Sequence, residues 1–420
     1  MARRERRRPL QPGRPRAGIF RRVTPLAPHD AEWIVREAVE TGRLEPELAH
    51  LIGEHLEAPG IRRAVMEGAA ESKRLARGDV VTFSRNVFIP LTNLCRNRCA
   101  YCTFAKPPES PEARTYALAE VADMARGGVR TGCVEALMCL GDKPEAAYRS
   151  HRVWLEERGW GSTAEYVVEA CRVAFECGLL PHTNAGVLSR REMERLRPWN
   201  ASMGLMLETT SSRLRGRGMA HQHAPDKEPS ARIRVHEEAG ELRIPFTSGL
   251  LLGIGETPAE RIETLLTIRR LDERYGHIQE AIIQPFHPKP ATRMRAASSL
   301  RDEEVAGWVA LARLVLGRGI QVQAPPNLLP GVLELLLQSG VSDWGGVSPV
   351  TVDYVNPEAP WPALEELRER TASTGQRLVE RLPVHAEYLG RPEFLDPRVR
   401  AAALRLADQD GYAAPRQEAA

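Results

Sequence analysis

The residues best suited to chemistry are three cysteines in the stretch IPLTNLCRNRCAYCTFA, residues 89–105. Cys95, Cys99 and Cys102 have the spacing C-x3-C-x2-C. Three thiolates hold three corners of a cubane 4Fe–4S cluster, whereas an electron-transfer cluster normally takes a fourth. A missing fourth ligand leaves one iron open, as a catalytic metal requires. We therefore predict one 4Fe–4S cluster with three cysteine ligands and an open iron.

Zinc binding and structural thiols remain open as alternatives. A zinc site needs a fourth ligand, and its cysteines usually come as two C-x2–4-C pairs far apart in the chain. The chain has seven cysteines, and those outside the loop form no second pair of that spacing. These remaining cysteines are predicted to be ordinary buried residues, namely Cys133, Cys139, Cys171 and Cys177.

Composition and charge bear on partners and compartment. The 420 residues carry a formal net charge of +3, which gives no case for a nucleic-acid or membrane partner. No apolar run approaches the ~20 residues that a membrane span needs, so we expect a cytoplasmic protein with reduced thiols. Residues 1–27 are rich in arginine. They are predicted to be a disordered tail, with a transit peptide or an arm for an anionic partner as alternatives.

Short apolar runs alternate with amphipathic segments from residue 79 onward. This alternation predicts a parallel α/β architecture, and seven or eight units of about 30–40 residues favour a (β/α) barrel, full or partial. A doubly wound open sheet is the alternative. The predicted strands cover 80–92, 134–141, 179–186, 201–208, 246–256, 278–286, 320–328 and, less regularly, 341–346; the predicted helices cover 116–125, 163–177, 190–196, 230–239, 258–275, 300–316 and 331–338.

The chain is predicted to fall into four parts. After the tail comes a helical extension over 28–78, where apolar residues recur at three- and four-residue spacing. The core barrel covers 79–320. Residues 321–420 form a C-terminal part that supplies the last barrel units and a segment that closes the barrel.

Polar residues follow most of the apolar runs. In a β/α barrel the loops after the C-terminal strand ends carry the chemistry, so we expect these residues to meet the cysteine loop at one mouth. Taken alone, a glutamate at a strand end is more often a solvated or capping residue, and a short Gly-rich turn is a weak signal. The residues concerned are Asp142, Lys143, His182, Asn184, Glu208, Glu256, Gln284 and His287.

The cysteine loop, with Tyr101 directly before its last cysteine, resembles the radical S-adenosylmethionine (SAM) superfamily. Longer stretches between about residues 81 and 382 resemble one family within it, the ring-closing subunit of 7,8-didemethyl-8-hydroxy-5-deazariboflavin synthases. They include GCVEALMCLGDKPE, IPFTSGLLLGIGET and, as the most specific part, DWGGVSPVTVDYVNPEAPWP, residues 343–362.

The resemblance implies a cofactor and the residues around it. The open iron would chelate SAM, whose one-electron cleavage gives methionine and a 5′-deoxyadenosyl radical. The family's Gly-Gly-Glu stretch is matched to GCVE, where Cys133 stands in place of the usual glycine. Besides the three cysteine ligands, the implied cofactor-binding residues are Tyr101, Gly132, Glu135, Asn184, Glu208, Gly253 and Glu256.

The resemblance also implies a reaction and partners. The family substrate is 5-amino-5-(4-hydroxybenzyl)-6-(D-ribitylimino)-5,6-dihydrouracil, and ring closure with loss of ammonia gives the deazaflavin, a lyase reaction. Proton transfer needs side chains of matched pKa, and Asp142, His182 and His287 are the predicted carriers. The implied partners are the hydroxybenzyl-transferring subunit, bound stably or transiently, and a reductant such as ferredoxin or flavodoxin.

Two other functions remain open at this point. One is a radical SAM enzyme acting on another aromatic or nucleoside adduct, as in menaquinone or thiamin synthesis. The other is an iron–sulfur protein that binds nucleic acid through the arginine tail. The stretch RGRGMAHQHAPDKEP, residues 215–229, contains His221 and His223 and is predicted to be a loop covering the site. Trp344 is predicted either to stack on an aromatic substrate or to pack in the core.

Overall fold

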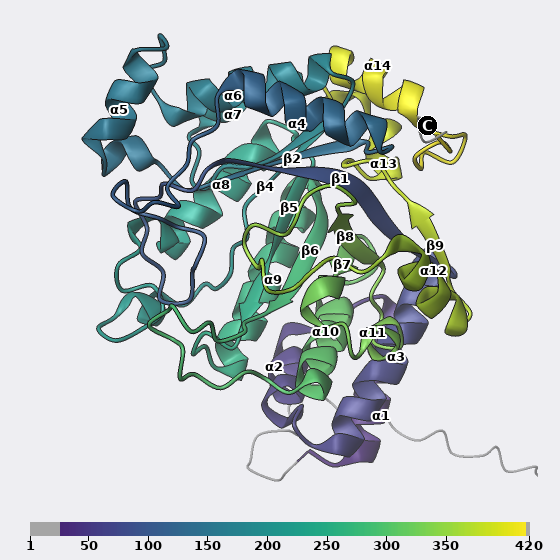
Figure 1. The fold of residues 1–420 in the computed structure, drawn as a ribbon. Helices are drawn as coiled ribbons and strands as arrows, with labels where there is room; N and C mark the ends of the chain where they lie inside the picture. Colours follow the sequence, from purple (N-terminus) through teal and green to yellow (C-terminus); the bar gives the residue numbers. More distant parts are fainter. Residues whose placement is uncertain (1–25, 417–420) are drawn as a thin grey trace, which may run out of the picture.

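The computed structural model describes residues 26–416, and the predicted (β/α) barrel is confirmed in it as a closed barrel (Figure 1). All strand pairs are parallel, β1 pairs with both β2 and β8, and β9 extends the sheet from β1. Most of the predicted tail, 1–27, lies outside the described residues. The strands are β1 (Val80–Thr92), β2 (Glu135–Leu140), β3 (Leu180–Asn184), β4 (Ser202–Gly204), β5 (Phe246–Leu252), β6 (Ile278–Pro285), β7 (Gln321–Gln323), β8 (Asp343–Val347) and β9 (Arg377–Glu380).

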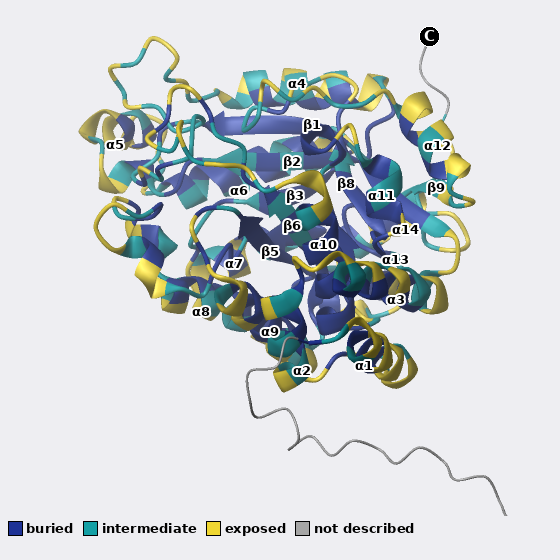
Figure 2. Cartoon of the chain, turned by 90° about the horizontal axis from the view of Figure 1, so that it is seen from below, coloured by how far each residue is buried: buried dark blue, intermediate teal, exposed yellow. Residues whose placement is uncertain are grey.

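Helices cover the outside of the barrel and turn their exposed residues to solvent (Figure 2). The helical extension packs beneath them, with α3 against α10 and α2 against α9. Among the described residues no helix is both long and apolar enough to cross a membrane. The α-helices are α1 (Pro28–Thr41), α2 (Pro46–His55), α3 (Pro59–Arg77), α4 (Leu118–Arg130), α5 (Arg149–Glu156), α6 (Thr163–Glu176), α7 (Arg190–Leu196), α8 (Pro229–Glu241), α9 (Pro258–Tyr275), α10 (Asp302–Leu316), α11 (Leu333–Leu337), α12 (Leu364–Ser373), α13 (Ala386–Leu389) and α14 (Pro397–Leu406).

The strands read as apolar runs because helices and the barrel interior bury both of their faces. Every residue of β5 is buried, for example. The structure shortens the fourth and the seventh predicted strands to three residues each, Ser202–Gly204 and Gln321–Gln323. In the fourth, the lost part includes Glu208. The chain beyond β4 turns toward the barrel mouth, and Glu208 adopts a left-handed backbone conformation with φ of 63°. This turn brings the Glu208 carboxylate over the strand ends.

The segment after β9 closes the N-terminal end of the barrel. Arg381 donates hydrogen bonds of 2.9 Å to both Glu280 on β6 and Asp343 on β8. With His385, these two carboxylates form a group whose ligand atoms lie within 4.8 Å of one another. The Arg381 guanidinium forms ion pairs with both carboxylates, and His385 lies 3.2 Å from Glu280, so this buried group is held together by its own charges. Chemistry is therefore left to the opposite end of the barrel.

Candidate active site

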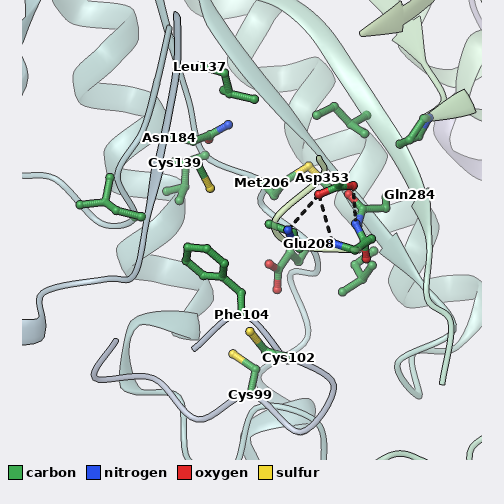
Figure 3. A pocket seen from close by; sticks show the side chains of 18 of the residues that line it. Cys99, Cys102, Phe104, Leu137, Cys139, Asn184, Met206, Glu208, Gln284 and Asp353 are labelled. Atoms are coloured by element: carbon green, nitrogen blue, oxygen red, sulfur yellow. Dashed lines mark hydrogen bonds between the residues drawn. The ribbon is translucent and has the colours of Figure 1, made fainter. Parts of the chain in front are cut away.

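A cavity of about 370 Å³ opens at the C-terminal ends of the strands. Figure 3 shows Cys99 and Cys102 at one edge of it, with Asn184 and Leu137 across from Gln284 and Asp353. Loops after six of the strands contribute to its wall, as expected for a barrel of this class. The predicted site residues that line it are Cys95, Cys99, Tyr101, Cys102, Asp142, Asn184, Glu208 and Gln284.

The three cysteines lie on the loop that follows β1. The backbone N–H groups of Asn97 and Asp142 donate to Cys95 Sγ at 3.4 and 3.2 Å. Donors of this kind stabilise sulfur atoms that carry charge in an iron–sulfur site. Burial raises the pKa of Cys95 to about 12 and that of Cys99 to about 11. These thiols therefore keep their protons until a metal displaces them.

The cysteine loop is covered by residues 209–228, which include most of the stretch 215–229 that was predicted to cover the site. The N–H of Ala100 donates to the Ala220 carbonyl oxygen at 2.8 Å, and the N–H of Arg98 donates to that of His223 at 2.8 Å. The Arg96 guanidinium forms a two-pronged ion pair with Asp226. These contacts fix the loop backbone before any cofactor enters.

A buried charged cluster centres on Glu208. Its carboxylate accepts a hydrogen bond from the Tyr101 hydroxyl at 2.7 Å and forms an ion pair with Lys227. His221 Nε2 lies 3.3 Å from the same carboxylate, and Arg232 lies 4.0 Å away. Burial alone would raise the pKa of Glu208, but Lys227, His221 and Arg232 hold it well below its usual range. The cluster thus keeps an ionised carboxylate beside Tyr101.

Gly141 allows the end of β2 to approach the cysteine loop. A Cβ atom added there would lie 2.0 Å from the Leu94 carbonyl oxygen and 2.7 Å from Cys95 Cβ. The following residue, Asp142, lines the cavity, and its Oδ2 accepts from the Val187 N–H at 3.3 Å. Oδ1 of Asp142 is buried and has no hydrogen-bond partner in the part of the chain that the structure describes. Gly141 and Asp142 therefore form part of the wall next to Cys95.

We expect Gly141→Ala to disturb the cysteine loop because the new methyl group meets backbone rather than a movable side chain. A displacement near 1 Å at such a site costs about 10²-fold in activity. Iron and sulfide bound after reconstitution, together with turnover, would measure the effect. Gly127→Ala is the control, since its nearest neighbour is an Arg130 side-chain atom at 3.9 Å. Equal iron content and activity in both variants would contradict the expectation.

The structure corrects the predicted positions of Gly132 and Glu135. Both lie at the start of β2, and Glu135 pairs in register with Asn86 and Leu180 at the closed end of the barrel. Only the other end of a parallel strand can reach the loops at the mouth. Gly141 and Asp142, at that other end, occupy the place beside the cysteine loop that the sequence prediction gave to GCVE.

The buried Glu135 predicts a pH-dependent change in stability. Burial raises its pKa to about 7, although Arg381 opposes the shift. The carboxyl group therefore destabilises the fold above pH ~7, by about 4 kcal/mol at most, and this cost disappears as pH falls toward the unfolded pKa near 4.3. We expect Glu135→Gln to raise the free energy of unfolding at pH 8 and to change it little at pH 5, as measured by urea denaturation. An unchanged stability at pH 8, or a weaker affinity for SAM, would contradict this placement.

Two predicted proton carriers do not line the cavity. His182 faces the barrel interior one layer below Asn184, because alternate residues of a strand share a face. Its Nδ1 lies 2.6 Å from Ser202 Oγ, and burial lowers its pKa to about 4. His287 follows the end of β6, outside the set of lining residues. Of the three predicted carriers, only Asp142 reaches the cavity.

Gly253 and Glu256 are also outside the cavity lining. Glu256 accepts hydrogen bonds from the backbone N–H groups of Gly253 and Ile254 at 2.7 and 2.8 Å. It also accepts from Arg261 Nε at 2.7 Å. With both oxygens engaged, this carboxylate shapes the loop after β5. Ile254 of that loop belongs to an apolar cluster on which Tyr101 packs, and the other members come from β5 and from the stretches after β4 and β6: Leu214, Ala220, Leu251 and Phe286.

Sequence reasoning gave no role to Lys227 and Arg232, which line the cavity beside Glu208. Lys227 lies in the predicted covering loop, and Arg232 lies on α8, where it is buried and donates to the Met206 carbonyl oxygen at 3.0 Å. A charged stretch such as PDKEPSARIR is typical of a solvated surface. The signals that could have found it were its place in the connection between the fourth and fifth predicted strands, residues 209–245, and the likeness of PDKEP to the family.

Known proteins resemble the chain in both sequence and fold. The model of the radical SAM superfamily matches residues 89–268. The 7,8-didemethyl-8-hydroxy-5-deazariboflavin synthase of Methanopyrus kandleri is 48% identical over 335 residues, which are 80% of this chain and 100% of that protein. The FO synthase of Mycobacterium tuberculosis is 48% identical over 413 residues, 95% of this chain, so the chain spans only 47% of that longer protein.

Solved structures share the fold at low sequence identity. The FeFe-hydrogenase maturase HydG from Carboxydothermus hydrogenoformans has a TM-score of 0.67 at 18% identity, covering 89% of this chain and 88% of that one. Methylornithine synthase (PylB) has a TM-score of 0.65 at 15% identity, covering 83% of this chain and 97% of that one. These structures support the barrel architecture.

Proposed function

The chain belongs to the radical SAM superfamily and, within it, to the family of 7,8-didemethyl-8-hydroxy-5-deazariboflavin synthases, and on that premise we propose that it closes the deazaflavin ring. The substrate would be the adduct of a 4-hydroxybenzyl group and a ribitylaminouracil, and ammonia would be released. The observation that carries the proposal is the 48% identity over the whole length of the Methanopyrus kandleri protein.

The residues present fit a 4Fe–4S cluster with an open iron. Three thiols lie on one loop at the cavity edge, and backbone N–H groups point at one of them. A single zinc ion would bring its ligand atoms to within about 4 Å of one another. Among the described residues, the one group of three His, Cys, Asp or Glu ligand atoms within 4.8 Å of one another is Glu280, Asp343 and His385. The thiol spacing therefore favours the larger cluster.

The charges around the cysteine loop fit the polar groups of SAM. Lys227 and Arg232 would bind its carboxylate. Glu208 would bind the ribose hydroxyls, and the apolar cluster beside Tyr101 would pack on the adenine. When bound, the cluster and SAM supply a 5′-deoxyadenosyl radical by one-electron cleavage of the sulfonium.

The chain itself would orient the substrate and exclude water. The covering loop 209–228 and the segment 348–362 after β8 lie over the mouth and shield a reactive carbon centre from solvent. Fixed placement of the reacting carbon next to SAM accounts for much of the rate in such sites. Asp142 is the carboxyl group from which we expect proton transfer during loss of ammonia.

The lengths of the relatives bear on whether hydroxybenzyl transfer and ring closure are carried out by one chain or by two. The chain matches all of one curated relative and about half of the other. We propose that the hydroxybenzyl transfer is done by a separate partner subunit and that ferredoxin or flavodoxin supplies the electron. The two need no stable interface, since the adduct can diffuse between them.

An anaerobic assay tests the proposal. The chain is reconstituted with iron and sulfide, reduced with dithionite and supplied with SAM and the adduct. We expect a product with deazaflavin absorbance and fluorescence, together with 5′-deoxyadenosine and ammonia. Formation of 5′-deoxyadenosine without deazaflavin would point to another adduct, as in menaquinone or thiamin synthesis. Binding of zinc with no cluster would overturn the assignment of the cysteines as cluster ligands, and with it the proposed reaction.

A further inference from the structure

The cavity wall opposite Asn184 carries buried polar atoms that have no hydrogen-bond partner among residues 26–416. Trp344 on β8 is 1% exposed and Asn327 after β7 is 3% exposed, and both line the cavity. The atoms concerned are Trp344 Nε1 and Asn327 Oδ1. Trp361, at the end of the segment over the mouth, also lines the cavity with its Nε1 buried and unpaired. Unpaired buried polar atoms are rare in native proteins and call for an explanation.

The orientation of the Asn327 amide is fixed by its neighbours. Its Nδ2 donates to Asp353 Oδ2 at 3.0 Å and to the Ala359 carbonyl oxygen at 3.1 Å. Both hydrogens are thus used, and Oδ1 must be the atom left free. Asp353 is itself held by the N–H groups of Val355 and Asn356 at 2.9 and 3.0 Å. Figure 3 shows this carboxylate with its hydrogen bonds at the cavity edge.

Hydrogen bonds connect residues 351–356, which include the Asp353 that holds Asn327, to neighbouring parts of the site. Lys289 after β6 donates to the Val355 carbonyl oxygen at 2.7 Å and to Asn356 Oδ1 at 2.9 Å. The same ammonium group lies 3.4 Å from Thr103 Oγ1 in the cysteine loop. Thr351 Oγ1 accepts from the Phe88 N–H on β1 at 3.0 Å. The unpaired atoms therefore sit on a fixed wall.

The wall offers two donors, both indole N–H groups, and one acceptor, the Asn327 oxygen. An imide edge presents the complementary set, a ring N–H between two carbonyl oxygens. We infer that Trp344, Asn327 and Trp361 bind the imide edge of the pyrimidinedione ring in the substrate and product. This inference rests on the proposed function for the identity of the molecule. Such a site discriminates strongly, because a molecule without the matching group leaves its buried atoms unpaired.

Equilibrium binding to the reconstituted full chain tests the inference by removing one group at a time. The probes are the deazaflavin product and its derivative methylated on the imide nitrogen, followed by deazaflavin fluorescence. We expect the methylated compound to bind roughly tenfold more weakly or worse, because it has no N–H for Asn327. Trp344→Phe and Trp361→Phe should each weaken binding of the product roughly tenfold. Trp33→Phe on α1, at an exposed position, is the control and should bind as the unaltered chain does.

The outcomes separate the inference from the proposed function. Equal binding of both probes by the unaltered chain would overturn the inference, even if the adduct assay gives deazaflavin. If Trp344→Phe loses both affinity for the product and the bound cluster, the substitution has disturbed packing. The inference is then tested by whether Trp361→Phe weakens binding of the product. Failure of the adduct assay would overturn the ring-closing function. If the adduct assay fails but the chain still binds the product more tightly than its methylated derivative, the imide site is upheld. If the chain then binds both compounds equally, the imide site is overturned as well.

Discussion

Replacing Cys99 with serine is expected to abolish deazaflavin formation, lowering the rate at least about 10³-fold. A serine hydroxyl is a hard oxygen ligand that does not replace a thiolate on iron. The loop backbone should stay in place, because its contacts to Ala220 and His223 are made by the main chain. Iron and sulfide content, the absorbance of the cluster and turnover of the adduct would measure the effect.

Cys177→Ser is the matched control for this experiment. Cys177 is half-buried at the C-terminal end of α6 and lies outside the cavity lining. It should retain both cluster and activity. If Cys99→Ser kept iron, sulfide and turnover while Cys177→Ser lost them, the assignment of the cluster to this loop would be wrong.

Glu208→Gln is expected to lower kcat/KM for SAM cleavage by about 100-fold while leaving the cluster content unchanged. The substitution keeps the shape of the side chain but removes the charge that Lys227 and Arg232 share. Those cations would then be buried without a compensating charge, and Tyr101 would lose a charged acceptor for its hydroxyl. Removing a partner that orients a binding group typically costs 10–100-fold.

Glu334→Gln is the control for the charge change. Glu334 forms a two-pronged ion pair with Arg370 at 2.7 and 2.6 Å, away from the cavity lining. It should leave SAM cleavage unchanged. A Glu208→Gln variant with wild-type kcat/KM, or one that loses its cluster, would contradict the role given to this carboxylate.

The barrel and the cysteine loop could be predicted because both depend on local patterns. Apolar runs and thiol spacing are visible in the sequence, and parallel topology then requires the strand ends to share one mouth. The assignment of Glu135 failed because it came from the match of GCVE to the family's Gly-Gly-Glu stretch and not from the rule that the site follows the C-terminal strand ends. A glycine and an acidic residue occur at both ends of β2, and the structure places Asp142, not Glu135, beside the cysteine loop.

Sequence patterns could not predict how far below the barrel mouth a side chain lies. His182 and Asn184 share the interior face of β3, but only Asn184 lies high enough to line the cavity. Lys227 and Arg232 could not be singled out either, since burial of their charges depends on Glu208, about 20 residues earlier in the chain. The pairing of Asn327 with Asp353 likewise depends on how the C-terminal segment folds over the mouth.

The central claim is that this cavity holds SAM and the adduct side by side, and transfer of isotope tests it most directly. The adduct is prepared with deuterium on the carbon atoms of its hydroxybenzyl group and turned over by the reconstituted chain with unlabelled SAM. We predict that deuterium appears in 5′-deoxyadenosine in step with the deazaflavin formed. Deazaflavin formed with unlabelled 5′-deoxyadenosine would contradict direct hydrogen transfer from the adduct in this cavity.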